Sequence, residues 1–515
     1  MTFRTERDTL GDVQVPAEAY YGAQTKRAIE NFPISGLRAP ESLVTATVLV
    51  KKSAAEANMR LGRLPRTIGR AIVKAADEIL DGKLRDQFVV DVYQAGAGTS
   101  HNMNTNEVLA NRAAELLGGA RGDTSLVHPN DHVNMGQSTN DVFPTSTRLA
   151  LLFLAPDLLR TGRALAAALD VKAREFRRVL KTGRTHLQDA VPITLGQEFG
   201  GYAACIMAGC DAVERSVEGL EELNLGGTAV GTGLNAGVDY IDAVFERLRL
   251  HTGLDVTPAA NRFRVTQSMG DVLSFSGALR RLAVELSKIA SDLRLLSMGP
   301  RAGLSEIQLP AVQPGSSIMP GKINPSIPEM VNQVCFQVRG CDATIEGACE
   351  AGQLELNVMM PVIAWNAIHA TSILTRAMDV LRERCVIGIT ADKARARELL
   401  DRSTAVATAL SPYIGYAATA EIAKDAVRTG RNVADLVRER GLIDPRRLEK
   451  ILSPEAMTAP GVPGEEQTRD KNTAGDRDRR GDDRRGGAGR DRQRAARAPR
   501  SAVSSRRSRH PRKPR

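Results

Sequence analysis

The amino-acid sequence predicts an all-α fold built around a bundle of long helices. Aromatic residues make up only 4% of the 515 residues, and the alternation of apolar and polar residues that marks β-strands is scarce. Long stretches without proline instead carry apolar residues at steps of three and four, the spacing of one helix face. With 42% hydrophobic residues, the chain can bury a large core.

The clearest helix is predicted over residues 272–298. Gly299-Pro300 ends its pattern, and similar proline-free segments cover residues 193–257, 329–360 and 362–411. The middle of the chain can therefore supply about five long helices, which predicts a helical bundle. The apolar seam of the clearest helix consists of Val272, Phe275, Leu279, Leu282, Leu286, Ile289, Leu293 and Leu296.

Residues 300–328 interrupt the helical pattern with six prolines and several glycines, which predicts an irregular loop. A loop of this length inside a helical protein is usually functional. It carries Ser316, Ser317, Lys322 and Asn324, so we expect it to take part in binding or catalysis.

The excess of positive charge lies at the C-terminal end. Residues 464–515 hold 18 of the 70 basic and 8 of the 60 acidic residues, which leaves 52 of each in the rest of the chain. Because the tail has almost no large apolar residue, we expect residues 461–515 to be disordered. An Arg-rich tail can bind nucleic acid, but it has no aromatic interleaving and no recognisable binding module, so a solvated extension is favoured.

Cysteine usage and the N-terminal sequence predict a cytoplasmic protein. No CxxC pair occurs, and the cysteines lie in apolar helical stretches, so we expect them to be reduced and packed. The N-terminus is charged from its fourth residue, which argues against a secretory signal, and we expect no run of the roughly 18 apolar residues that a membrane span requires. The cysteines are Cys205, Cys210, Cys335, Cys341, Cys349 and Cys385.

Four polar clusters interrupt the helical pattern, at residues 96–104, 134–141, 183–189 and 315–329. A single cluster of this kind usually caps a helix. Together their hydroxyl and amide donors, joined by Lys322 and His186, would suit a small dianion, because they can hydrogen-bond two carboxylates without a metal. From the residues alone, a purely structural histidine is an equal alternative for His186.

Nucleotide and metal sites are disfavoured. The segment from Gly315 to Lys322 is a near miss to a P-loop, with five residues between its glycines and Ile323 where Ser or Thr is needed. The glycine-rich run 226–233 has no preceding strand, so a tight turn is expected there. A proline-containing sequence separates His128 from His132, which indicates a turn rather than a pair of metal ligands.

The sequence GSSIMPGKINP, from Gly315 to Pro325, closely resembles the signature of the aspartase/fumarase superfamily, and the likeness extends from about Glu6 to about Pro460. It implies an all-α protomer of three domains with a central five-helix bundle, assembled as a homotetramer with a 20-helix core. Each active site would take residues from three subunits. The implied divisions are an N-terminal helical domain at 1–138, a bundle domain at 139–395 with a lid loop at 313–328, and a small C-terminal helical domain at 396–460.

Within the superfamily, most marker segments resemble aspartases. The aspartase-like segments are residues 88–99, 137–140, 328–334 and 350–358. Two other segments, 111–119 and 141–144, resemble class II fumarases. The resemblance therefore implies reversible elimination of ammonia from L-aspartate to give fumarate. Hydration of fumarate is the alternative, and a third possibility is a non-catalytic relative with a polyanion-binding tail.

The resemblance also assigns roles to individual residues. Ser316 would be the base that takes the Cβ proton, and Glu329 would pair with His186 and orient it. Lys322 and Asn324 would bind one substrate carboxylate. No cofactor and no metal site are implied, while activation by divalent cations and a second anion site at His128 to Asp131 stay open. The other carboxylate and the amino group would be held by Thr99, Ser138, Thr139, Asn140, Thr185 and His186.

Overall fold

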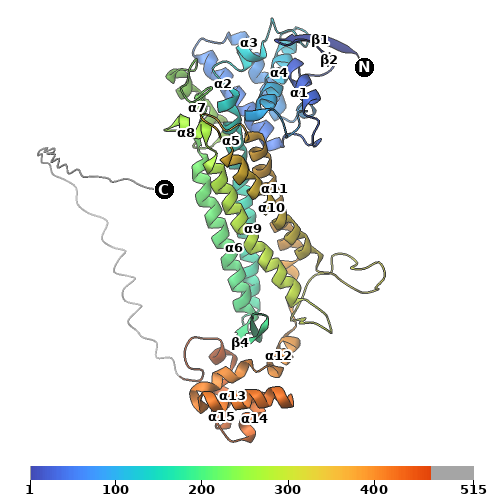
Figure 1. The fold of residues 1–515 in the computed structure, drawn as a ribbon, viewed down its shortest axis with the longest axis vertical. Helices are drawn as coiled ribbons and strands as arrows, with labels where there is room; N and C mark the ends of the chain where they lie inside the picture. The colour runs from blue at the N-terminus through green and yellow to red at the C-terminus, as the bar shows by residue number, and fades with distance from the viewer. Residues whose placement is uncertain (1, 466–515) are drawn as a thin grey trace, which may run out of the picture. The chain divides into compact units, whose positions relative to one another are not determined.

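The computed structural model describes residues 2–465, and helices dominate them (Figure 1). Five long helices run side by side, which confirms the predicted all-α bundle. They are α5 (Thr139–Glu175), α6 (Leu195–Val217), α9 (Gly270–Leu296), α10 (Ser326–Glu350) and α11 (Met360–Arg384).

Shorter elements precede, connect and follow the bundle helices. Before them come β1 (Phe3–Asp8), β2 (Gly11–Pro16), α1 (Ala23–Asn31), α2 (Glu41–Arg60), α3 (Arg66–Leu80) and α4 (Thr99–Leu116). Between them lie β3 (Leu180–Thr185), β4 (Gln188–Thr194), β5 (Glu222–Leu223), α7 (Val238–Thr252), β6 (Thr257–Pro258), α8 (Arg262–Gln267) and β7 (Ile307–Gln308). After them come β8 (Thr390–Ala391), α12 (Lys393–Arg402), α13 (Ser411–Thr429), α14 (Val433–Glu439), α15 (Pro445–Ile451) and α16 (Pro454–Met457).

Buried apolar side chains form one large core in the bundle and smaller clusters on either side of it in the sequence. All eight seam residues predicted for α9 are at most 5% exposed. The bundle core reaches α2, a second cluster packs α2, α3 and α4 together, and a third lies among α12 to α15. The seam spacing of three and four residues thus places an unbroken apolar stripe of α9 against its neighbours.

The longest helix, α5, was not among the proline-free segments, because it contains Pro144 and Pro156. Pro144 has no N–H to donate to the carbonyl of Asn140, and that carbonyl accepts from Asn224 Nδ2 at 3.0 Å instead. The expectation that no run is apolar enough to span a membrane was wrong for this helix. Of its apolar 18-residue window, 72% is buried inside the protein, as in a core helix.

Two antiparallel hairpins, β1–β2 and β3–β4, are the largest departures from the helical pattern. The proline-free segment 193–257 is also not one helix, because α6 ends at Val217 and α7 begins at Val238. The glycine-rich run 226–233 lies between them as the predicted tight turn, with positive φ angles at Gly226, Gly231 and Gly233.

All six cysteines lie within the described residues and are free, as predicted. The C-terminal part of the described chain extends past Pro460, where the Tyr413 hydroxyl donates to the Pro463 carbonyl. The predicted disordered tail falls mainly on residues 466–515, which lie outside the described residues.

Candidate active site

The first group of predicted site residues gathers at the start of α5. Ser138 is the N-cap: its hydroxyl accepts from the Asn140 amide at 3.3 Å, and its own amide donates to Asp141 at 2.9 Å. Asn102 on α4 donates from Nδ2 to Thr139 Oγ1 at 3.0 Å, which brings the clusters at 96–104 and 134–141 together. Thr99 is exposed in the first turn of α4. The hydroxyl and amide side chains therefore gather where α4 and α5 begin.

Lys51 on α2 holds two side chains of the cluster at residues 134–141, and the sequence did not identify it as a site residue. Its side chain is fully buried, and Nζ donates to Asn134 Oδ1 at 2.7 Å and to Gln137 Oε1 at 3.0 Å. Burial lowers the pKa of Lys51 to about 7, partly opposed by the Asp141 carboxylate. A lysine pair within an otherwise apolar helical segment, at Lys51-Lys52, was the signal available in the sequence.

Asp141 joins the start of α5 to the glycine-rich turn. Its carboxylate accepts from the backbone amides of Ser138, Gly226 and Thr228 at 2.9 to 3.0 Å. Burial raises the pKa of the Asp141 carboxyl to about 6, and the backbone donors and Lys51 lower it in part. Because Asn140 also donates from Nδ2 to the Ala229 carbonyl at 2.8 Å, the turn fixes the position of the second polar cluster.

The second group begins at the β3–β4 hairpin, whose tip carries Thr185 and His186. Thr185 pairs with Gln188, so His186 and Leu187 form a two-residue loop. Both have positive φ, 55° and 59°, the geometry of a type I′ turn. For a leucine this backbone conformation is rare, and strain of this kind is concentrated at functional sites. The hairpin thus presents an exposed imidazole at its end.

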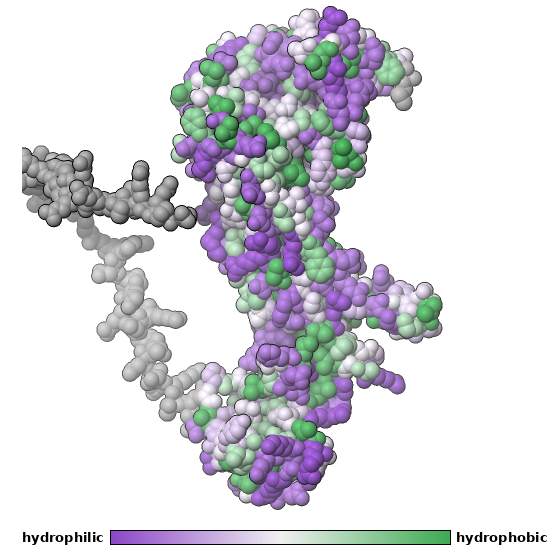
Figure 2. All heavy atoms as spheres, in the orientation of Figure 1, coloured by the Kyte–Doolittle hydropathy of each residue, from purple (hydrophilic) through white to green (hydrophobic). Residues whose placement is uncertain are grey.

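The lid loop (residues 313–328) projects from the side of the bundle and ends in apolar side chains (Figure 2). Ile318, within this loop, is 83% exposed. Ser316 Oγ accepts hydrogen bonds from the backbone amides of Ile318 at 3.2 Å and Met319 at 3.0 Å. Two donors aimed at one hydroxyl oxygen would stabilise its negatively charged form. Lys322 is exposed on the same loop.

Two hydrogen bonds within the lid loop join its two sides near the bundle. Gly315 donates to the Lys322 carbonyl at 2.8 Å, and Asn324 donates from Nδ2 to the Gly315 carbonyl at 2.6 Å. A Cβ at Gly315 would lie 2.4 Å from the Lys322 carbonyl oxygen, so this close approach requires glycine. Ser316, Lys322 and Asn324 are therefore held in one small loop.

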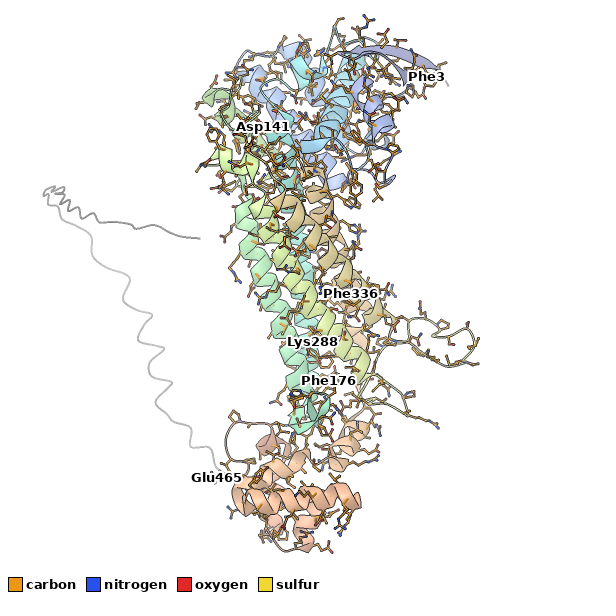
Figure 3. The ribbon with its side chains drawn as sticks, in the orientation of Figure 1. Phe3, Asp141, Phe176, Lys288, Phe336 and Glu465 are labelled. Carbon is orange, nitrogen blue, oxygen red and sulfur yellow. The ribbon has the colours of Figure 1, made fainter. Side chains whose placement is uncertain are left out.

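One chain does not bring the two groups together. Figure 3 shows Asp141, at the start of α5, and Phe176, just after its end, at opposite ends of the bundle. The 37 residues of α5 span about 55 Å at 1.5 Å per residue. Thr99, Ser138, Thr139 and Asn140 lie at the first end, and the β3–β4 hairpin follows the second. Within residues 2–465, no ion pair or hydrogen bond joins His186 to Glu329, which lies in the first turn of α10.

The His128 to Asp131 segment forms a short π-helical turn at Pro129–Val133 rather than a simple turn. His128 Nδ1 lies 3.3 Å from Asp131, and its ring borders a cavity of about 640 Å³ that Arg7 and Arg27 also line. Among residues 2–465, no group of three or more His, Cys, Asp or Glu side chains is placed to hold a metal ion.

Most of the chain matches known protein families. Residues 11–340 match the family described as Lyase, and residues 406–459 match the fumarase C C-terminus family. The chain belongs to the aspartase/fumarase superfamily. Within the superfamily it is 50% identical over 461 residues to an aspartate ammonia-lyase of a Bacillus species, covering 90% of this chain and 98% of that protein.

Solved structures of the superfamily share the fold. A cobalt-bound structure described as fumarate lyase:delta crystallin from Brucella melitensis has 51% identity and a TM-score of 0.86, covering 89% of this chain and all of that one. A class II fumarase from Schistosoma mansoni has 37% identity and a TM-score of 0.85, with 89% and 100% covered. A class II fumarase thus shares the fold of this chain, so the fold alone does not identify the reaction.

Proposed function

We propose that this protein is an aspartate ammonia-lyase, which reversibly eliminates ammonia from L-aspartate to give fumarate. The observation that carries this proposal is identity of about 50% to aspartate ammonia-lyases over about 90% of the chain, against 37% to the class II fumarase. The site chemistry supports it, because uncharged donors with one lysine and one histidine suit a dicarboxylate.

The lid loop supplies the base in this proposal. Ser316, as the alkoxide, takes the proton from Cβ of aspartate, and the electron pair moves into the adjoining carboxylate to give a dianionic aci-carboxylate. That electron pair then returns to form the Cα–Cβ double bond as the Cα–N bond breaks and ammonia leaves. The amides of Ile318 and Met319 and the charge of Lys322 favour the alkoxide.

Substrate binding divides between two sets of residues. Lys322 and Asn324 bind one carboxylate, and Thr99, Ser138, Thr139, Asn140, Thr185 and His186 hold the other carboxylate and the amino group. The second set is itself divided in one chain, because α5, about 55 Å long, lies between Ser138 at its start and the hairpin with Thr185 and His186 after its end. The proposal therefore requires residues from several copies. We assign a homotetramer with shared active sites, in which Glu329 of one copy pairs with His186 of another.

The rest of the proposal follows from this assignment. The reaction uses no cofactor, closure of the lid loop excludes water, and the protein works in the cytoplasm. The division into domains at 1–138, 139–395 and 396–460 is supported by the three apolar clusters, which lie mainly before, within and after the bundle.

The test is an absorbance assay of fumarate with the purified full-length protein. Fumarate formation from L-aspartate, with release of ammonia in equal amount, is expected. L-malate is the matched alternative substrate, because the fumarase-like segments 111–119 and 141–144 favour a hydratase. Activity with malate and none with aspartate would reverse the assignment.

A non-catalytic protein that binds a polyanion through its tail is the remaining alternative. It predicts no turnover with either substrate, and RNA binding that weakens with salt and is lost on truncation after Pro460. Turnover by the truncated protein at the parental rate would separate catalysis from the tail.

A further inference from the structure

Four charged side chains meet where the β3–β4 hairpin joins the bundle. Arg184 contacts both oxygens of Glu306, Nη1 to Oε2 and Nη2 to Oε1, each at 3.0 Å. Lys181 Nζ lies 3.2 Å from Glu306 and 3.1 Å from Glu198, a residue of α6. Two cations and two carboxylates therefore alternate along one connected chain of ion pairs.

This cluster is buried. Glu306 is 0% exposed, Lys181 2%, and the Arg184 side chain 16%. A carboxylate removed from water in this way needs its cationic partners, and the two-point contact of Arg184 fixes orientation as well as distance. Lysine in place of Arg184 would retain the charge but lose this orientation.

The hairpin is irregular beside this cluster. Its register shifts between Thr182 and Arg184, where one residue of β3, Gly183, stands opposite two residues of β4. A Cβ at Gly183 would lie 2.5 Å from the Val191 carbonyl oxygen, so the close approach of the two strands requires glycine. Residues three apart point to opposite faces of a regular strand, yet Lys181 and Arg184 both reach Glu306 at this irregular part of the hairpin.

The cluster connects the hairpin to the chain that leads into the lid loop. Glu306 follows α9, and its backbone donates to the Leu296 carbonyl at 2.9 Å and accepts from Asp392 at 3.0 Å. Arg184 immediately precedes Thr185 and His186. Within residues 2–465, the structure records no hydrogen bond from the side chains of Thr185 or His186, so their orientation depends on the base of the hairpin.

We propose that the Arg184–Glu306 pair is a positioning device that orients Thr185 and His186 for substrate binding. The proposal rests on the assigned aspartate ammonia-lyase activity and adds positioning residues to it. Arg184 and Glu306 touch no substrate; they act through the hairpin tip. A purely structural pair would need only charge compensation, whereas positioning needs the two-point geometry.

The first test is Arg184→Lys in the full-length protein. KM for L-aspartate is expected to rise at least about tenfold while kcat falls less than about threefold, because residues that hold the substrate move and the lid loop is unchanged. Arg395→Lys is the matched control: Arg395 donates to the carbonyls of Gly303 and Leu304, beside Glu306, and no hydrogen bond or ion pair among residues 2–465 joins it to the hairpin. Its KM is expected to stay at the parental value.

The second test separates positioning from stability. Glu306→Leu should lower the thermal midpoint, because Arg184 and Lys181 both lose a buried partner. Arg184→Met combined with Glu306→Leu should recover the part of that loss due to Arg184, since Lys181 keeps Glu198. The double variant is expected to retain the raised KM. A parental KM in the double variant, or in folded Arg184→Lys, would overturn the proposal. Absence of aspartate turnover in the parent protein would instead refute the assigned function.

Discussion

The Ser316 hydroxyl is the group on which the proposed chemistry depends most. Its oxygen accepts two backbone hydrogen bonds from Ile318 and Met319, so donors for the alkoxide are already in place. Ser316→Ala removes the base and leaves the assigned carboxylate contacts unchanged. We expect kcat to fall about 10² to 10⁴-fold and KM for aspartate to stay within about threefold. Initial rates of fumarate formation measure both constants.

Ser317→Ala is the control for this prediction, because Ser317 is the exposed neighbour on the same loop. It is expected to keep the parental kcat. A Ser316→Ala enzyme that turns over at close to the parental rate would remove Ser316 from the role of base.

His101 predicts how stability responds to acid. It is 1% exposed, and burial, with the charge of Lys51, lowers its pKa to about 4. Below pH 6.5 the unfolded chain therefore binds a proton that the folded protein does not. The stability contribution is present above pH 6.5 and is lost as pH falls towards 4, by about 3 kcal/mol at most at 1.4 kcal/mol per pKa unit. Asp141 acts oppositely between about pH 6 and 4, because its pKa is raised to about 6.

The variant for this prediction is His101→Gln, which keeps a side-chain donor and no longer titrates. His101 Nε2 lies 3.0 Å from Thr47 Oγ1, and that hydroxyl donates to the Leu43 carbonyl. The thermal midpoint of the variant should fall less than that of the parent between pH 7.5 and 5. Thr47→Val removes the same contact but keeps the buried imidazole of His101, so it should show the parental pH dependence. An unchanged dependence in His101→Gln would contradict the assignment.

At the scale of single residues, the sequence predicted the polar clusters but not the buried charged residues that contact them. Ser138 and Thr139 stand out because hydroxyl residues break an apolar pattern. Lys51 does not, because nothing in the sequence says which of two adjacent lysines faces inward. Arg184 and Glu306 are 122 positions apart, and only the fold brings them into contact.

At the scale of elements, a buried ion pair holds two bundle helices together. Arg148 on α5 is fully buried and contacts both oxygens of Asp271 on α9, at 2.6 and 3.1 Å. Asp271→Asn would leave the arginine charge buried without compensation. We expect the free energy of unfolding to fall by about 3–5 kcal/mol, measured by chemical denaturation at a fixed chain concentration.

The control for this pair is Glu214→Gln, which removes the partner of Arg163 between α5 and α6. Both side chains of that pair are about half exposed, so its loss should change stability by less than about 1 kcal/mol. Equal losses in Glu214→Gln and Asp271→Asn would show that burial of the pair is not the cause.

Elements were predictable where burial follows a regular spacing. The seam runs from Val272 to Leu296 along the 27-residue helix α9, so its period is unmistakable, and every seam position is buried. Two kinds of element were missed for opposite reasons. Prolines concealed α5, although a long packed helix tolerates them, and β3–β4 is too short to show a strand period, especially with an extra residue in β4 opposite Gly183.

At the scale of the whole molecule, residue patterns predicted a helical bundle, whereas the domain division and the tetramer came from the resemblance alone. Periodicity says which face of a helix is buried, but not whether its own chain or another copy covers it. The separation of the site residues along α5 supplies a physical argument for assembly. The proposal places Ser138 and Ser316 at one substrate, whereas in one chain the lid loop projects from the side of the bundle, away from the start of α5 (Figure 1).

This argument predicts that two inactive variants restore each other's activity in mixed tetramers. Ser138→Gly removes a side-chain hydroxyl that is proposed to bind the substrate, and glycine is tolerated as the N-cap of α5. Ser316→Ala removes the proposed base. Random mixing by co-refolding at equal amounts should give about a quarter of the parental activity, because that share of sites draws both intact serines from different copies. Ser316→Ala mixed with Lys322→Ala is the control; both lie on one lid loop, so no intact site can form. If the first mixture is as inactive as the control, each site is built from a single chain and the shared-site assignment fails.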